Sequence, residues 1–103
     1  MQNLIKKSAM IMQESDNVAT LIDSADTGEA VTIVDVGRSI LFEVTALNPI
    51  EEGHKIATRS IPEGENVVKY GFAIGVARLS ISKGEHVHVN NLDSQKGRGD
   101  KRQ

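Results

Sequence analysis

The chain has 103 residues, no cysteine, no tryptophan and only three aromatic side chains, Phe42, Tyr70 and Phe72. A chain of this length folds as one domain with one small, here aliphatic, core, and it leaves little room for a deep pocket of its own. The lack of cysteine excludes disulfides, thiolate metal sites and a cysteine nucleophile. Size alone therefore argues against a free-standing enzyme and favours a domain that works with a partner chain.

The charge balance narrows the classes of partner. There are 12 basic and 14 acidic side chains, for a net charge of −2, and the basic excess lies in residues 93–103. No basic face and no aromatic platform are expected, which argues against nucleic-acid binding. Apolar runs are too short for a membrane span or a signal-peptide core, so we expect a cytoplasmic protein with no membrane partner.

Turn-forming residues punctuate the chain densely and separate short runs rich in valine, isoleucine and threonine. This pattern is typical of short strands joined by tight turns. A short helical turn is expected only at residues 49–52, with Asn48 as its cap. The sequence therefore predicts an all-β domain with strands at residues 18–22, 30–34, 39–47, 55–58, 66–70, 77–79 and 85–89.

Two segments of the chain resemble each other. Residues 60–67 match residues 80–87 at five of eight positions, and a fainter copy lies at residues 28–31. Each copy indicates a strand end, a turn with glycine and a strand start. We therefore expect similar turns to occupy related places in a compact module.

The three histidines are the sharpest chemical feature of the sequence. His86 and His88 alternate along a predicted strand, so their rings point to one face, roughly 6–7 Å apart, and Val87 faces the core. His54 follows the turn at Gly53 and begins another strand. Three interpretations stay open: a metal site of His54, His86 and His88, a contribution to a partner's active site, or a solvated face that binds nothing.

Several other polar residues are candidates for binding. Asn90 shares the parity of the histidines and can supply an amide to the same face, although Asn-Asn pairs also suit turns. Lys69 is a candidate anion binder and Tyr70 a candidate hydrogen-bond donor, although Tyr70 and Phe72 are better interpreted as core or rim packing. Asp16 and Asn17 precede a strand and indicate a turn.

Five segments, taken in order, resemble a known module. They are residues 16–19, 53–57, 61–65, 69–75 and 84–92. Together they resemble the SAF domain of the altronate–galactarate dehydratase (UxaA) family, and the alpha subunit of (2R)-sulfolactate sulfo-lyase is similar. The resemblance covers residues 8–92 and leaves residues 1–7 and 93–103 as flexible ends. It implies a β-clip fold, a small twisted structure of mostly antiparallel strands.

The resemblance also implies a function. The chain would be the small subunit of a two-chain carbon–oxygen lyase, whose large subunit carries the catalytic body and a divalent metal such as iron. This chain itself would bind no cofactor. Because polar, hydrogen-bonding residues cluster on an otherwise aliphatic module, we further expect its face with His54, His86, His88 and Asn90 to cap the large subunit's site. Lys55 or Lys69, with Tyr70, would meet the carboxylate of a sugar acid.

The sequence is also compatible with other functions. The chain could be the alpha subunit of a (2R)-sulfolactate sulfo-lyase, a stand-alone carbohydrate-binding module, or a small metal-dependent enzyme acting through its histidines. A homo-oligomer of the isolated chain is a further expectation. Nothing in the sequence separates altronate from galactarate or sulfolactate as substrate.

Overall fold

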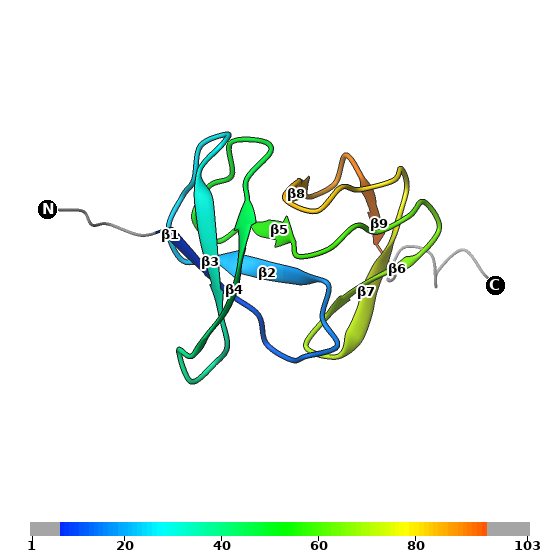
Figure 1. Ribbon diagram of the computed structural model, residues 1–103. Helices are drawn as coiled ribbons and strands as arrows, with labels where there is room; N and C mark the ends of the chain where they lie inside the picture. Colours follow the sequence, from blue (N-terminus) through cyan, green and yellow to red (C-terminus); the bar gives the residue numbers. More distant parts are fainter. Residues whose placement is uncertain (1–6, 95–103) are drawn as a thin grey trace, which may run out of the picture.

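The structure, a computed structural model, describes residues 7–94 as two β-sheets (Figure 1). One sheet has six strands in the order β4-β3-β1-β2-β5-β8, and the other has the order β6-β7-β9. All pairs are antiparallel except β1 with β3, and the described residues contain no helix, which confirms the all-β prediction. The strands are β1 (Lys7–Met10), β2 (Val18–Leu21), β3 (Ala30–Val34), β4 (Ile40–Thr45), β5 (Lys55–Ala57), β6 (Asn66–Lys69), β7 (Phe72–Ala77), β8 (His86–Val87) and β9 (Leu92–Ser94).

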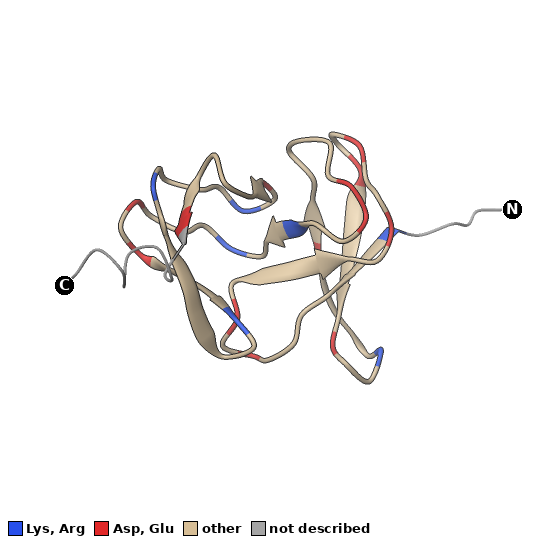
Figure 2. Ribbon diagram, turned by 180° about the vertical axis from the view of Figure 1, so that it is seen from behind, with Lys and Arg blue, Asp and Glu red and all other residues tan. Residues whose placement is uncertain are grey.

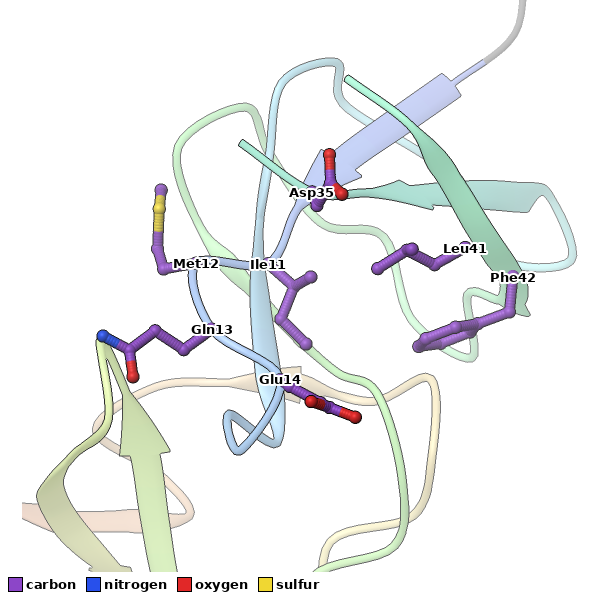
Figure 3. A pocket seen from close by; sticks show the side chains of 7 residues that line it. All are labelled: Ile11, Met12, Gln13, Glu14, Asp35, Leu41 and Phe42. Atoms are coloured by element: carbon purple, nitrogen blue, oxygen red, sulfur yellow. The ribbon is translucent and has the colours of Figure 1, made fainter. Parts of the chain in front are cut away.

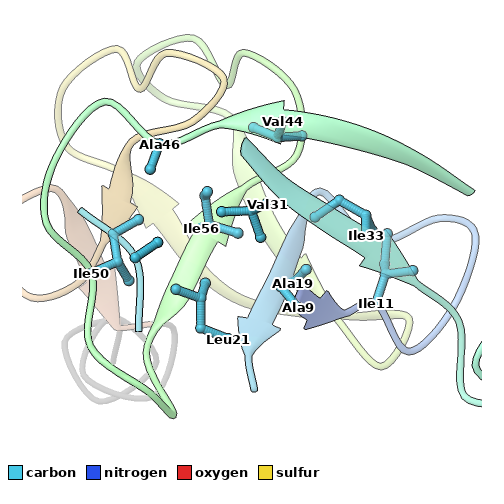
Figure 4. Packing of buried hydrophobic residues seen from close by; sticks show 11 residues of the cluster. Ala9, Ile11, Ala19, Leu21, Val31, Ile33, Val44, Ala46, Ile50 and Ile56 are labelled. Atoms are coloured by element: carbon cyan, nitrogen blue, oxygen red, sulfur yellow. The ribbon is translucent and has the colours of Figure 1, made fainter. Parts of the chain in front are cut away.

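The aliphatic side chains pack into two clusters rather than the single core expected from length. Neighbouring residues of β2 and β5 divide between them: Ala19 and Ile56 enter the first cluster, Val18 and Ala57 the second. Because successive side chains of a strand point to opposite faces, β2 and β5 form a wall with a core on each side. Figure 4 shows the first cluster, to which strands β2 to β5 contribute the branched side chains Leu21, Val31, Ile33, Val44 and Ile56.

Four similar turns organise the chain around these clusters. In each, a residue in an isolated bridge is followed three positions later by a glycine with φ between 86° and 95°. Ile61 bridges Ile81 in one pair of turns, and Ala25 bridges Ile50 in the other. The sequence similarity therefore correctly predicted related places for its turns, but it did not reveal the fourth copy. The four glycines are Gly28, Gly53, Gly64 and Gly84.

The helical turn predicted at residues 49–52 is wrong. Ile50 instead exchanges two backbone hydrogen bonds with Ala25, at 2.8 and 2.9 Å, so this segment is extended at its centre. Asn48 does not cap a helix, because its Oδ1 accepts a hydrogen bond from the backbone of His86. The Asn-Pro sequence favours a local helical turn, but the pairing of Ile50 with Ala25 determines the conformation here.

The bounds of other strands also differ from those predicted from the sequence. Of the strand predicted at residues 77–79, only Ala77 lies in a strand, as the last residue of β7, and the strand predicted at residues 85–89 is only two residues long. Neither β1 nor β9 was expected. The predicted flexible ends lie mostly outside the described residues, although Lys7, Asp93 and Ser94 belong to strands.

Asp16 and Asn17 fasten the second sheet to the first. The Asp16 carboxylate, 1% exposed, accepts hydrogen bonds from the backbone N–H groups of Gln13, Tyr70 and Gly71 at 2.8–3.0 Å. The Asn17 side chain accepts from the Val68 N–H at 2.8 Å and also donates to a β6 carbonyl. This pair is therefore a clamp on the β6–β7 hairpin, and not only the turn that the sequence indicated.

Candidate functional site

The three histidines meet at the β8 edge of the six-stranded sheet. His86 opens β8 and lies opposite Ile56 of β5, while His54 immediately precedes β5 and His88 immediately follows β8. Val87, between the two histidines, is 1% exposed in the second cluster. The alternation predicted from the sequence is confirmed, and strand pairing adds the third ring.

The histidine rings are in direct contact. The Nδ1 of His54 lies 2.9 Å from the Nε2 of His86, so one ring donates a hydrogen bond and the other accepts it. The rings of His86 and His88 stack, with centroids 4.1 Å apart and planes inclined by 20°. The Nδ2 of Asn90 lies 3.3 Å from the Nε2 of His88, which places Asn90 on the same face as predicted. We call His54, His86, His88 and Asn90 the histidine face.

His54 reaches this face because of its place in a repeated turn. In two of the sister turns the residue after the glycine is a glutamate whose carboxylate binds its own turn. Glu29 accepts a hydrogen bond from the N–H of Asp26 at 2.8 Å, and Glu85 from the N–H of Ser82 at 2.6 Å. The corresponding side chain in the turn of Gly53 is His54, whose ring contacts His86 instead.

Two asparagine side chains hold the backbone beneath the rings. Asn48 Oδ1 accepts the His86 N–H at 3.0 Å. Asn91 accepts the His88 N–H at 2.9 Å through Oδ1 and donates to the His86 carbonyl at 2.8 Å through Nδ2. These bonds satisfy backbone groups on the outer side of β8, which is an edge of the six-stranded sheet. Sequence reasoning missed the anchoring role of Asn48, because its partner is 38 residues away.

A polar pocket of about 330 Å³ opens beside the rings. Its walls combine His86, His88 and Asn90 of the histidine face with the loops before β5 and after β7. The lining residues are Asn48, Leu79, Ser80, Glu85, His86, His88, Asn90 and Asn91. Hydrogen-bonding groups dominate this lining, so the pocket suits a hydroxylated ligand better than an apolar one.

Burial and neighbouring basic groups lower the pKa values of His86 and of the nearby Lys55. The pKa of His86 is lowered from its ordinary value of 6.5, first by burial and then by His88, His54 and Lys55, while Glu51 opposes the shift. Burial, and then the charge of Lys69, lowers the pKa of Lys55. His86 is therefore neutral at neutral pH, able to accept a proton and to donate one.

This shift predicts how acid affects folding. Because the folded protein disfavours protonated His86, its contribution to stability is present above pH 6.5 and is lost as the pH falls below that value. Urea unfolding at about pH 7.5 and about pH 5 should show a larger loss for the wild type than for His86→Asn, which cannot titrate. Equal losses in the two proteins would show that His86 titrates normally in the folded state.

The rings form a hydrogen-bonded cluster in this arrangement. Among residues 7–94, no group of three or more His, Cys, Asp or Glu side chains is placed to hold a metal ion. The 2.9 Å between His54 and His86 nitrogens is a hydrogen-bond distance. Two nitrogens on one tetrahedral zinc would stand about 3.4 Å apart. A three-histidine metal site therefore finds no support here.

The remaining candidates lie at varied distances from the face. Lys55 is half-buried on β5 and close enough to affect His86 electrostatically. Lys69 ends β6 and its Nζ lies 5.6 Å from the ring centroid of Tyr70. Tyr70 and Phe72 are 54% and 73% exposed, so of the expected core or rim packing the core is excluded. Charged residues are otherwise spread over the turns and strands of both sheets (Figure 2).

Fold and site together define a small all-β module with an open, histidine-lined pocket at one sheet edge. Residues 7–95 match the family model of the altronate/galactarate dehydratase SAF domain, and the chain belongs to this family. No helix within residues 7–94 is long and apolar enough to cross a membrane.

Curated relatives carry two kinds of name. Altronate dehydratase of Bacillus subtilis (strain 168) is 39% identical over 85 residues, which are 82% of this chain and 16% of the relative. The altronate dehydratase of Escherichia coli (strain K12) is 42% identical over 76 residues, 74% of this chain and 14% of that protein. The (2R)-sulfolactate sulfo-lyase subunit alpha of Chromohalobacter salexigens is 34% identical over 90 residues, 84% of this chain and 94% of the subunit. The chain thus spans only about a sixth of the first relative but nearly all of the sulfo-lyase subunit.

Proposed function

We propose that this SAF domain completes the active site of a sugar-acid dehydratase of the altronate or galactarate type, whose catalytic body is a larger chain. Family membership and the altronate dehydratase relatives support the reaction class. The observation that carries the proposal is the histidine face itself, three imidazoles in contact beside an open polar pocket. Such an open face would form a complete site when a surface of the larger chain covers it.

The chemistry of dehydration matches these groups. A base takes the proton from the carbon next to the carboxylate, hydroxide leaves the adjacent carbon and takes up a proton as water, and the enol becomes a 2-keto acid. When the hydrogen-bonded pair of His54 and His86 carries one extra proton, that proton can pass through the contact between His54 Nδ1 and His86 Nε2 to the departing hydroxyl, which leaves as water while both rings become neutral. His88 and Asn90 would bind sugar hydroxyls, and Lys55 or Lys69 with Tyr70 would attract the carboxylate.

The larger chain would hold the divalent metal, iron or a similar ion, as the resemblance to the dehydratase family implies. Such an ion would supply charge stabilisation for the enolised carboxylate. The residues of this chain would then contribute proton transfer and hydrogen bonds rather than metal binding.

A second candidate function is that of the alpha subunit of a (2R)-sulfolactate sulfo-lyase. The match to that subunit extends over 94% of its length, whereas the dehydratase matches cover 14–16% of theirs. The chemistry is again an elimination, with sulfite leaving in place of hydroxide. The same histidine face would serve either leaving group.

Turnover by the two-chain complex tests the proposal. The chain is co-expressed with the large dehydratase-type chain of the same organism and assayed with altronate, galactarate and (2R)-sulfolactate. We expect His86→Ala with His88→Ala to lower turnover at least about tenfold, since positioned proton transfer contributes at least that much. Formation of 2-keto acid without sulfite identifies a dehydratase, and sulfite release identifies a sulfo-lyase.

A matched control lies in the sister segment. Asn66 occupies the position of His86 in residues 60–67 and is exposed, so Asn66→Ala should leave turnover near the wild-type rate. Wild-type turnover in the double histidine variant, with the complex intact, would refute a role for the face in catalysis.

A further inference from the structure

We infer that a second surface, at the opposite edge of the six-stranded sheet, docks this domain on the larger chain. The occupant of this surface would be an apolar segment of the larger chain that carries a basic side chain. The inference rests on the proposed function, which supplies the larger chain. The surface is a pocket of about 450 Å³ between the loop after β1 and the β3–β4 hairpin. Its lining residues are Ile11, Met12, Gln13, Glu14, Asp35, Leu41 and Phe42, and Figure 3 shows their side chains.

A β-bulge shapes the apolar wall of this pocket. The β3–β4 register passes from Ile33 opposite Phe42 to Val34 opposite Ile40, which leaves Leu41 as the extra residue. Adjacent residues of a regular strand point to opposite faces, but here Leu41 and Phe42 both project toward the pocket (Figure 3). The bulge thus presents two neighbouring apolar side chains on one side of an edge strand.

These side chains are exposed in the isolated domain. Leu41 is 48%, Phe42 39% and the adjoining Ile40 71% exposed. Three consecutive exposed apolar residues on a strand edge are unfavourable in water and favour pairing with another protein. Within residues 7–94, β4 pairs with β3 alone, so its outer edge is open to such contact.

Charge identifies the chemistry of the occupant. Two carboxylates, Glu14 and Asp35, flank the apolar wall (Figure 3). They repel the carboxylate of a sugar acid, so this pocket is not a second substrate site. They attract a lysine or arginine, and an apolar segment that carries one would fill the pocket and pair both charges.

The position of the pocket leaves the histidine face free. β4 and β8 are the two edges of the sheet, with four strands between them. The chain just after β4 does meet the segment before β8, where the Leu47 N–H donates to the Gly84 carbonyl at 2.9 Å, but the pocket lies at the start of β4, beside the β3–β4 hairpin. A partner held at β4 can therefore be disturbed there without touching His86 at β8.

The test is binding of this chain to the co-expressed large chain from the same organism, measured by calorimetry on the purified proteins. Leu41 lies on β4 and Leu47 lies two residues after its end. The two side chains are almost equally exposed, 48% and 46%, so Leu47 is the control for Leu41. We expect Leu41→Ser to weaken binding at least about tenfold and Leu47→Ser to change it less than about twofold. Glu14→Lys should also weaken binding, because it reverses one of the attracting charges.

Each outcome separates docking from function. Unchanged affinity in Leu41→Ser, with circular dichroism showing a folded protein, overturns the docking surface while the proposed function stands. If the variant with His86→Ala and His88→Ala loses turnover but binds as the wild type does, both proposals are supported. If the wild-type chain binds no large chain, the proposed function fails and the docking surface with it. If light scattering shows a dimer of the isolated chain that Leu41→Ser dissociates, the pocket is an interface between copies and the inference is wrong.

Discussion

Replacing Gly84 by alanine is expected to destabilise the domain by about 3–4 kcal/mol, a large part of the roughly 5–10 kcal/mol that holds a chain of this length folded. Gly84 is buried with φ at +95°, and a Cβ there would overlap the carbonyl oxygen of Thr45 and approach Leu47 Cγ to 3.2 Å. Backbone strain and steric overlap therefore add. Urea unfolding of the variant measures the sum.

The sister turn provides the control for this prediction. Gly64 has nearly the same φ, +89°, but a Cβ there would meet no atom within 4 Å. Gly64→Ala should therefore cost only the strain of a positive φ, about 1 kcal/mol. Equal losses in the two alanine variants would show that close packing at Gly84 contributes nothing beyond its backbone angle.

Local sequence signals were sufficient for the strands that contain branched aliphatic runs. Residues 30–34 became β3 with the predicted bounds, because alternate valine and isoleucine side chains there are fully buried. β1 has only one buried side chain, Ala9, and no branched run, so its central place in the sheet comes from pairing with both β2 and β3. Such pairing cannot be deduced from four residues considered alone.

The two glycines at β7 have different roles. Gly71 has a positive φ, whereas Gly75 does not and lies within the strand. A Cβ at Gly75 would overlap the Asp93 carbonyl oxygen and the Leu92 side chain of β9. That glycine therefore allows close approach of a neighbouring strand, a purpose invisible without knowledge of β9.

The candidate site was predictable in part for the same reason. The spacing of His86 and His88 predicted their common face correctly, although β8 ends at Val87. Asn90 reaches the same face from a turn, in which the Asn91 N–H donates to the His88 carbonyl at 2.9 Å, and not from a continued strand. The contact between His54 and His86 joins residues 32 apart and depends on the pairing of β5 with β8, which required the fold.

Asp16→Ala is expected to destabilise the domain by about 3 kcal/mol, since it leaves backbone N–H groups of the β6–β7 hairpin without their charged acceptor. Asp16→Asn, which keeps one acceptor oxygen, should lose less. Glu14→Ala, two residues away and exposed, should change the free energy of unfolding by under about 0.5 kcal/mol. A loss in Asp16→Ala no larger than in Glu14→Ala would contradict the clamp.

The turn that Asp16 holds also explains why the carboxylate matters so much. Tyr70 and Gly71 both have positive φ, 58° and 77°, and a tyrosine in this region is strained by about 1–2 kcal/mol. The carboxylate accepts both of their N–H groups, at 3.0 and 2.8 Å, and so stabilises a turn that the tyrosine alone disfavours. Tyr70→Gly should consequently raise the free energy of unfolding, and the gain in the Asp16→Ala background should be at least as large as the gain in the wild type. Comparing the two gains by urea unfolding measures how far the buried carboxylate compensates the strain at Tyr70.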